Sequence, residues 1–234
     1  MPTAAFTAPN ERSSSTSLRE KLLNLFVSPG DVFEEVVAAP ARLANWLVPT
    51  LLVCLAGMFL LLVSSPKEQS ADQVRQWVEA GTISPTQAEK FFQGWPLVSS
   101  LAICLSAFGG TFWSAFALWF IGRTFLKSRF LFTKALEVAG LATMVLVLGT
   151  IVTALLVAVT GDVSTRPSLS LFIGGPNVPD RLRLVLDLTN LFYLWTTGVL
   201  AAGLSKMGGV TFKEAAYWVF GYWVVLRAAL IVLG

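Results

Sequence analysis

Apolar residues gather into five long runs along the chain, and polar residues fall mainly in the segments between them. Each run is about 20 residues long or longer, which is enough for a helix to cross a hydrocarbon core of about 30 Å at 1.5 Å per residue. The pattern therefore predicts an all-α fold, a polytopic membrane helix bundle with five transmembrane helices. The predicted spans are residues 43–63, 97–121, 135–159, 184–204 and 215–234.

Two shorter amphipathic helices are expected ahead of the first run. Ser17 is placed to cap a helix that begins at Leu18, and Ser28-Pro29 is typical of a second helix start, which Pro40 brings to an end. Their apolar positions are Leu18, Leu22, Leu23, Phe26, Val32, Phe33, Val36 and Val37. Both helices are too short to span a membrane. They suit either the inner membrane surface or packing against protein beneath the bundle.

The chain divides into three parts on this interpretation. Residues 1–17 are small and polar, and we expect a disordered N-terminal tail. Residues 18–42 hold the amphipathic interfacial helices, and residues 43–234 form the five-span transmembrane domain. No apolar stretch follows a basic start in the tail, so no signal peptide is expected and the first span directs insertion.

The connections between the predicted spans differ in character. Residues 64–96 predict two short helices, one over 71–80 and a second opened by Ser84-Pro85. Residues 160–183 are rich in Gly, Pro and Ser. The connections after the second and fourth spans are short.

Lysine and arginine set the expected orientation, because cytoplasmic segments carry an excess of them. The N-terminal segment and the second and fourth connections hold Arg12, Arg19, Lys21, Arg42, Arg123, Lys127, Arg129, Lys134, Lys206 and Lys213. The other two connections, which are longer, hold Lys67, Arg75, Lys90, Arg166, Arg181 and Arg183. We therefore expect a multi-pass protein of the cell's inner (plasma) membrane, with a cytoplasmic N-terminus and an external C-terminus.

Composition argues against most enzyme classes. Only 13% of the residues are charged, against about 25% in soluble domains, and there is no histidine. A Ser-His or Cys-His pair is thus excluded, and no zinc-protease or phosphate-loop motif occurs. Cys54 and Cys104 lie inside apolar runs and are interpreted as small hydrophobes. We predict no catalytic residue, no cofactor and no metal site.

Charged residues at membrane depth are the most informative polar signals, since each is costly there. Asp187 and Arg227 are expected in the outer leaflet, on adjacent antiparallel spans, where they can form an ion pair. Such a pair would either set the register of two helices or take part in moving an ion or substrate. Alternatively the two do not meet, and Arg227 reaches outward to the interface. Asn190 and Thr197 fall on the Asp187 face, and Trp223 is placed for a cation–π contact with Arg227.

Two glutamates are expected at the cytoplasmic starts of spans. Glu137 opens the third span and Glu214 the fifth, with Lys134 and Lys213 close by in the sequence. Helix N-termini favour carboxylates through the helix dipole. We therefore interpret both as interfacial charges that cap helices.

Three segments carry a family resemblance. They are LLNLFVSPGDVFEEV (residues 22–36), FTKALEVAGLATMV (residues 132–145) and DLTNLFYLWTTGVLAAGLSKMGGVTFKEAAYWV (residues 187–219), the last containing an LFxLW segment. With them the chain resembles the Yip family of five-span membrane proteins with a cytosolic N-terminus. The resemblance implies a scaffold that organises other proteins, and some bacterial relatives accompany ABC-type exporters. Only about 40 residues precede the first span, so the long acidic N-terminal extension typical of the family's eukaryotic traffic proteins is not expected here. This favours the bacterial branch.

Two functions are carried forward from the sequence. The first is a non-enzymatic membrane scaffold or accessory subunit, which would hold its partner through the connection 64–96 or through the amphipathic helices. The candidate partner face of those helices contains Leu22, Leu23, Phe26, Val32 and Phe33. The alternative is a small transporter or channel that uses the polar face of span four, although no inverted repeat is seen. Expected partners are membrane lipids and other membrane proteins, including further copies of the chain, but no nucleic acid.

Overall fold

The computed structural model describes residues 16–64, 74–163, 165–173, 182, 185–186 and 188–233. These residues form helices and connections, with no strand among them, so the predicted all-helical fold is confirmed. The elements are α1 (Leu18–Asn24), α2 (Pro29–Ala38), α3 (Ala44–Val63), α5 (Pro85–Thr124), α6 (Phe132–Thr160), α7 (Ser170–Ile173), α9 (Leu191–Gly208) and α10 (Phe212–Leu233).

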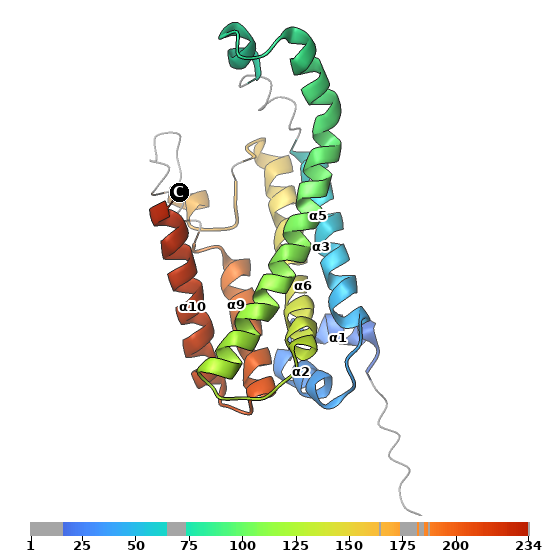
Figure 1. Cartoon of the computed structure of the whole chain (residues 1–234), viewed down its shortest axis with the longest axis vertical. Helices are drawn as coiled ribbons and strands as arrows, with labels where there is room; N and C mark the ends of the chain where they lie inside the picture. Colours follow the sequence, from blue (N-terminus) through green and yellow to red (C-terminus); the bar gives the residue numbers. More distant parts are fainter. Residues whose placement is uncertain are drawn as a thin grey trace, which may run out of the picture.

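The helices α3, α5, α6, α9 and α10 run lengthwise through the molecule, and α1 and α2 lie together at one end of them (Figure 1). At that same end α5 gives way to α6 and α9 to α10, through residues 125–131 and 209–211. We call this the basic end, because it gathers the lysine- and arginine-rich segments that the sequence grouped together. The two connections of lower basic density lie at the opposite end.

Three of the helices are long and apolar enough to cross a membrane. They are Ala44–Val63 in α3, Gln93–Thr124 in α5 and Phe132–Thr160 in α6. The protein is therefore a membrane protein with several apolar helices. The helices α9 and α10 lie alongside these three and pack against each other.

The core is built around α6, which contacts α3, α5 and α9. Gly140 lets α6 approach α3 closely: a Cβ there would lie 2.3 Å from the Cα of Trp46. Gly203 does the same between α9 and α6, where a Cβ would lie 2.1 Å from a methyl carbon of Val138. Small residues at helix crossings are the usual means of close packing in membranes. Lipid tails are as apolar as the helices, so the hydrophobic effect does not drive the helices together.

The connection predicted over residues 64–96 needs a correction. The helix that begins after Ser84 does not stop before the membrane but continues through Pro96 as the 40-residue α5. Its start is as predicted, because Ser84 and Gln87 form a reciprocal capping box. At 1.5 Å per residue α5 is about 60 Å long, twice the hydrocarbon thickness. Its first part therefore stands beyond the other helices (Figure 1).

The predicted start of span four is also wrong. The helix α9 begins at Leu191 rather than 184, and Asn190 is its N-cap, accepting a hydrogen bond from the Phe192 backbone N–H at 3.0 Å. Residues 188–189 form a turn ahead of it. Apolar residues flank Asp187, Thr189 and Asn190 on both sides, so hydropathy averaged along the chain did not reveal the cap. The helices α3, α6 and α10 begin and end within three residues of the bounds predicted for the first, third and fifth spans.

Candidate functional site

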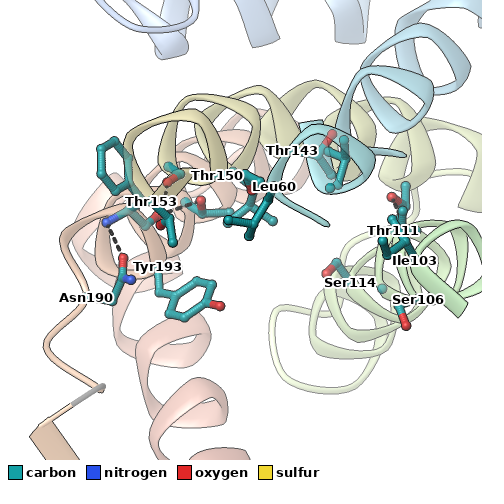
Figure 2. A pocket seen from close by; sticks show the side chains of 18 of the residues that line it. Leu60, Ile103, Ser106, Thr111, Ser114, Thr143, Thr150, Thr153, Asn190 and Tyr193 are labelled. Carbon is teal, nitrogen blue, oxygen red and sulfur yellow. Dashed lines mark hydrogen bonds between the residues drawn. The ribbon is translucent and has the colours of Figure 1, made fainter. Parts of the chain in front are cut away.

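A cleft of about 600 Å³ opens between α5 on one side and α6 with α9 on the other. Figure 2 shows hydroxyl groups on both walls, among them those of Ser106, Thr111 and Ser114 on α5. The polar lining from the other elements comprises Thr143, Thr150, Thr153, Arg166, Asn190, Tyr193 and Thr196. Apolar side chains such as Val53, Leu60 and Ile103 complete the wall.

Most of the threonine hydroxyls in this wall bond to their own helices. Thr111, Thr143, Thr153 and Thr196 each donate to a carbonyl oxygen three or four residues earlier, at 2.7–2.9 Å. Their hydrogens are thus occupied, and each presents a methyl group and oxygen lone pairs to the cleft. Such a wall can surround an apolar occupant without leaving these donors unsatisfied.

Arg166 is the charged side chain among the described residues that line the cleft. Its Nη1 donates to the carbonyl oxygens of Val163 at 2.7 Å and Thr165 at 2.9 Å. The segment that carries it is joined to the start of α9, because the Leu191 N–H donates to the Pro167 carbonyl at 3.3 Å. Arg166 and the Asn190 cap thus lie at the end of the cleft remote from the basic end.

The polar cluster predicted from the sequence is only partly assembled here. Asn190 lines the cleft. Thr197 does not: it is buried and donates to the Tyr193 carbonyl at 2.8 Å. Asp187 lies outside the described residues, and its pairing with Arg227 stays a prediction.

Arg227 is held by aromatic rings. Its guanidinium carbon lies 5.9 Å from the Trp223 ring centroid, which confirms the predicted cation–π contact. It lies closer, at 4.9 Å, to the ring of Tyr193 on α9. The sequence reasoning missed Tyr193, which also lines the cleft. A tyrosine one turn into a membrane helix carries no pattern that singles it out, since its partner is on another helix.

A second polar site lies at the basic end, around the carboxylate of Glu137. This side chain is 1% exposed. Its Oε1 accepts hydrogen bonds from the Arg42 backbone N–H and from Asn45 Nδ2, both at 2.7 Å. Its Oε2 accepts one from Lys134 Nζ at 2.8 Å. The predicted interfacial charge is thus a buried acceptor that joins α6 to the start of α3.

Lys134 extends the same site to α2. Its Nζ also donates to the carbonyl oxygens of Val36 at 2.7 Å and Ala39 at 2.6 Å, which closes the C-terminal end of α2. A cation suits this position, because the last carbonyls of a helix carry partial negative charge. We call this set of residues the Glu137 junction: Val36, Ala39, Arg42, Asn45, Lys134 and Glu137.

The candidate partner face of the amphipathic helices is largely occupied within the chain. Val32 and Phe33 are buried, and Phe26 meets Trp195 of α9 edge to face, with ring centroids 5.7 Å apart. Leu22 packs against the same core. The apolar face of these helices thus packs against protein beneath the bundle, and a place on the inner membrane surface stays a prediction.

Leu23 departs from the predicted face. Its side chain is 60% exposed, whereas Leu25, which the helical pattern left out, is fully buried. The reason is that Leu25 keeps the αR conformation and lies three residues after Leu22, on the buried face, whereas Leu23 is turned about 100° away from Leu22 around the helix.

Two ion pairs among the described residues also hold the amphipathic helices in place. Lys21, itself 1% exposed, lies 3.1 Å from Glu35, and Lys206 of α9 pairs with Glu34. Burial works to raise the pKa of Glu35, but hydrogen bonds from Thr16 and Lys21 outweigh it and hold the pKa below its ordinary value. The hydrogen bond and charge of Lys206 lower the pKa of Glu34.

Comparison with known proteins assigns the family. The family model of the Yip1 domain matches residues 23–233, which is almost the whole chain. No curated protein and no solved structure matches. The Yip family is a membrane protein family not known as enzymatic, in agreement with the three apolar helices. The chain therefore belongs to the Yip1 domain family.

Proposed function

We propose that this protein is a non-enzymatic membrane scaffold or accessory subunit, with five spans and a cytoplasmic N-terminus in the inner membrane. The observation that carries the proposal is a rigid helical arm at the end opposite the basic end. We define the outer arm as residues 74–95. Residues 85–95 of the arm are the first part of α5, so this continuous helix fixes the position of the arm relative to the membrane (Figure 1).

Five spans are inferred from how the last two helices lie. The 18 residues of α9 measure about 27 Å, close to the hydrocarbon thickness. Both α9 and α10 run beside the three apolar helices, with exposed apolar side chains such as Leu191 and Val225. An odd number of spans leaves the two termini on opposite sides, and the basic end then faces the cytoplasm.

The outer arm has the surface of a protein-binding element rather than of a lipid-binding one. Val74 and Ala88 are the buried apolar residues among the described side chains of the arm. Its exposed residues include Trp77 and polar side chains of both charges: Arg75, Gln76, Glu79, Gln87, Glu89 and Lys90. The amphipathic helices are less suitable for partner binding, because their apolar face is already covered by α9 and α6.

The test is purification of the tagged full-length protein from its native membrane in mild detergent, followed by mass spectrometry of companions. The arm variant is Glu89→Lys with Lys90→Glu, which reverses two exposed charges without touching the core. Asp31→Lys, an exposed reversal on α2, is the matched control. We expect a stoichiometric companion that is lost from the arm variant and kept by the control. An ABC-type exporter subunit is the companion that the bacterial branch of the family implies.

Two results would contradict the proposal. A chain that purifies without any companion has no stable accessory role, and a companion that both variants keep does not bind through the arm. Deleting residues 18–40 would be a poor test. It would expose the core that α2 covers and unfold the bundle for reasons unrelated to partners.

The cleft favours a second candidate, a small transporter or channel. Flux through liposomes that Asp187→Asn abolishes, with the protein still folded, would support this candidate. The hydroxyls available to line such a path are those of Ser106, Ser114, Thr150 and Tyr193, because the other lining threonines bond back to their own helices.

A further inference from the structure

The cleft lies at the depth of the membrane, because α5 and α6, which form much of its walls, are membrane-crossing helices. Along α6 its lining runs from Ala139 to Thr153, 14 residues apart, or about 21 Å at 1.5 Å per residue. One leaflet of a bilayer is about 15 Å of hydrocarbon. The cleft is thus long enough to take an acyl chain that enters from the leaflet remote from the basic end.

Arg166 supplies a charged group at the mouth of the cleft. A guanidinium carries five N–H donors, and only Nη1 is bonded to described residues, by its two bonds to carbonyl oxygens. Nε and Nη2 are left as the adjacent pair that binds a phosphate or carboxylate in two-pronged fashion. No ion pair joins Arg166 to a carboxylate in the part of the chain that the structure describes.

The remaining wall selects the chemistry of the occupant. Beyond Arg166 the described lining is uncharged, and four of its threonines bond to their own helices. The hydroxyls of Ser106, Ser114, Thr150 and Tyr193 make no hydrogen bond to described residues, whereas Val53, Leu60, Ile103, Leu146 and Leu200 give the wall the apolar surface that an acyl chain requires. The site therefore matches an amphiphile that has an anionic head and an apolar tail.

We propose that this cleft binds one membrane phospholipid, with its phosphate on Arg166 and an acyl chain between α5 and α6–α9. This goes beyond the scaffold role, which concerns the outer arm and a protein partner. The occupant is committed to a lipid because the phase beside the cleft at this depth is lipid. Free phosphate shares the same head chemistry and is separated from it by the experiment.

The experiment uses the full-length protein in nanodiscs of phosphatidylglycerol and phosphatidylethanolamine. After transfer to detergent, the phospholipids retained by each molecule are counted by native mass spectrometry. We expect one tightly held phospholipid in the unaltered protein. Arg166→Gln removes the charge-assisted contact, worth one to two powers of ten in affinity, and should reduce retention about tenfold or more.

A cleft-filling variant tests the acyl-chain part. Gly110 lines the cleft, and a Cβ there would meet no atom within 4 Å, so Gly110→Leu adds a side chain into open space. Gly109 is equally unobstructed but is absent from the lining, and Gly109→Leu is its matched control. We expect retention to fall about tenfold for Gly110→Leu and to stay unchanged for Gly109→Leu.

Three outcomes would overturn the proposal. Equal retention by the two leucine variants would place the lipid elsewhere. Retention unaffected by Arg166→Gln would remove the head-group contact. Binding of inorganic phosphate to lipid-free protein in detergent, with no retained phospholipid, would make the cleft a phosphate site. None of these outcomes bears on whether a companion binds the outer arm, so the two proposals fail separately.

Discussion

The Glu137 junction and the cleft handle polar groups inside a membrane bundle in opposite ways. At the junction a carboxylate and an ammonium are nearly fully buried, and together they take up donors and acceptors from α2, α3 and α6. In the cleft the polar groups are mainly hydroxyls, of which Thr111, Thr143, Thr153 and Thr196 bond within their own helices and the others make no hydrogen bond to described residues. Helices meet tightly at the first site and stay apart at the second.

This difference separates structural polarity from polarity that is free for a ligand. Buried charges are tolerated only when each is paired and fully hydrogen-bonded. The junction meets that requirement inside the chain. It links the amphipathic helices to the bundle and leaves neither of its two charged groups available to a ligand. The cleft leaves part of the Arg166 guanidinium and the hydroxyls of Ser106, Ser114, Thr150 and Tyr193 without a hydrogen-bond partner among the described residues, which is the condition for binding something from outside.

The largest expected effect comes from breaking the junction. Glu137→Ala strands Lys134 without its carboxylate and leaves the Asn45 amide without its acceptor. We expect a loss of about 3–5 kcal/mol in the free energy of unfolding, as for removal of one partner of a buried pair. Denaturant unfolding in mixed micelles measures it. Thr153→Val in the cleft is the control, with about 1 kcal/mol or less expected; equal losses would erase the contrast between the two sites.

A glycine pair tests whether close packing differs in the same way. Gly140→Ala places a methyl group against the Trp46 backbone and should cost about 1–3 kcal/mol through overpacking. Gly110→Ala enters open space and should be neutral, or stabilising by up to about 1 kcal/mol from helix propensity. The melting temperatures of the two purified variants, compared in one detergent, give the answer. A Gly140→Ala protein as stable as the parent would mean that α3 and α6 can slide apart.

The Asn190 cap is a smaller contribution from the cleft side. Asn190→Ala removes the acceptor for the Phe192 N–H and should cost about 1 kcal/mol. Asn190→Ser keeps a capping oxygen and should recover most of it. Hydrogen exchange over the first turn of α9 is the direct readout. Exchange that is unchanged in the alanine variant would show that the 165–169 segment, not the cap, holds this helix start.

The smallest effect is a pH dependence at the basic end. The folded-state pKa of Glu35 lies below the unfolded value, so its ion pair with Lys21 stabilises the fold above that unfolded pKa. The contribution is lost as the pH falls below 4.5, the ordinary pKa, and through the folded pKa. Hydrogen exchange in α1 and α2 should therefore speed up in acid beyond the intrinsic change. In Glu35→Gln this extra acceleration should be absent, and finding it there would assign it to another group.

Much of the fold could be read from hydropathy, because a membrane helix must be apolar along its length. The positions of α3, α6 and α10 follow directly from that requirement, and the capping residues Ser17 and Ser84 mark real helix starts. The two errors have local causes. The predicted second span begins after Pro96, whereas α5 continues through this proline. The Asn190 cap of α9 has apolar residues on both sides in the sequence.

The candidate site was predicted less completely than the fold. The Arg227–Trp223 contact could be found from helical spacing, because both residues lie on one helix. Asn190 was placed by a spacing that assumes a helix from residue 184, whereas it is the N-cap of α9. Arg166 and Tyr193 could not be found from spacing, since their importance comes from lying beside other helices. The same holds for Glu137, whose sequence neighbour Lys134 was noticed but whose partners Arg42 and Asn45 lie more than 90 residues away.

By itself the sequence determined the helical class, the membrane setting, the family and the grouping of basic segments at one end. These follow from composition and short-range periodicity, which act along the chain. Only the tertiary structure decided that α2 is fastened beneath the bundle, that α5 projects as an arm, and that a cleft separates α5 from α9. Those features depend on which helix faces meet. Hydropathy carries little of that information in a membrane, because lipid and protein neighbours are equally apolar.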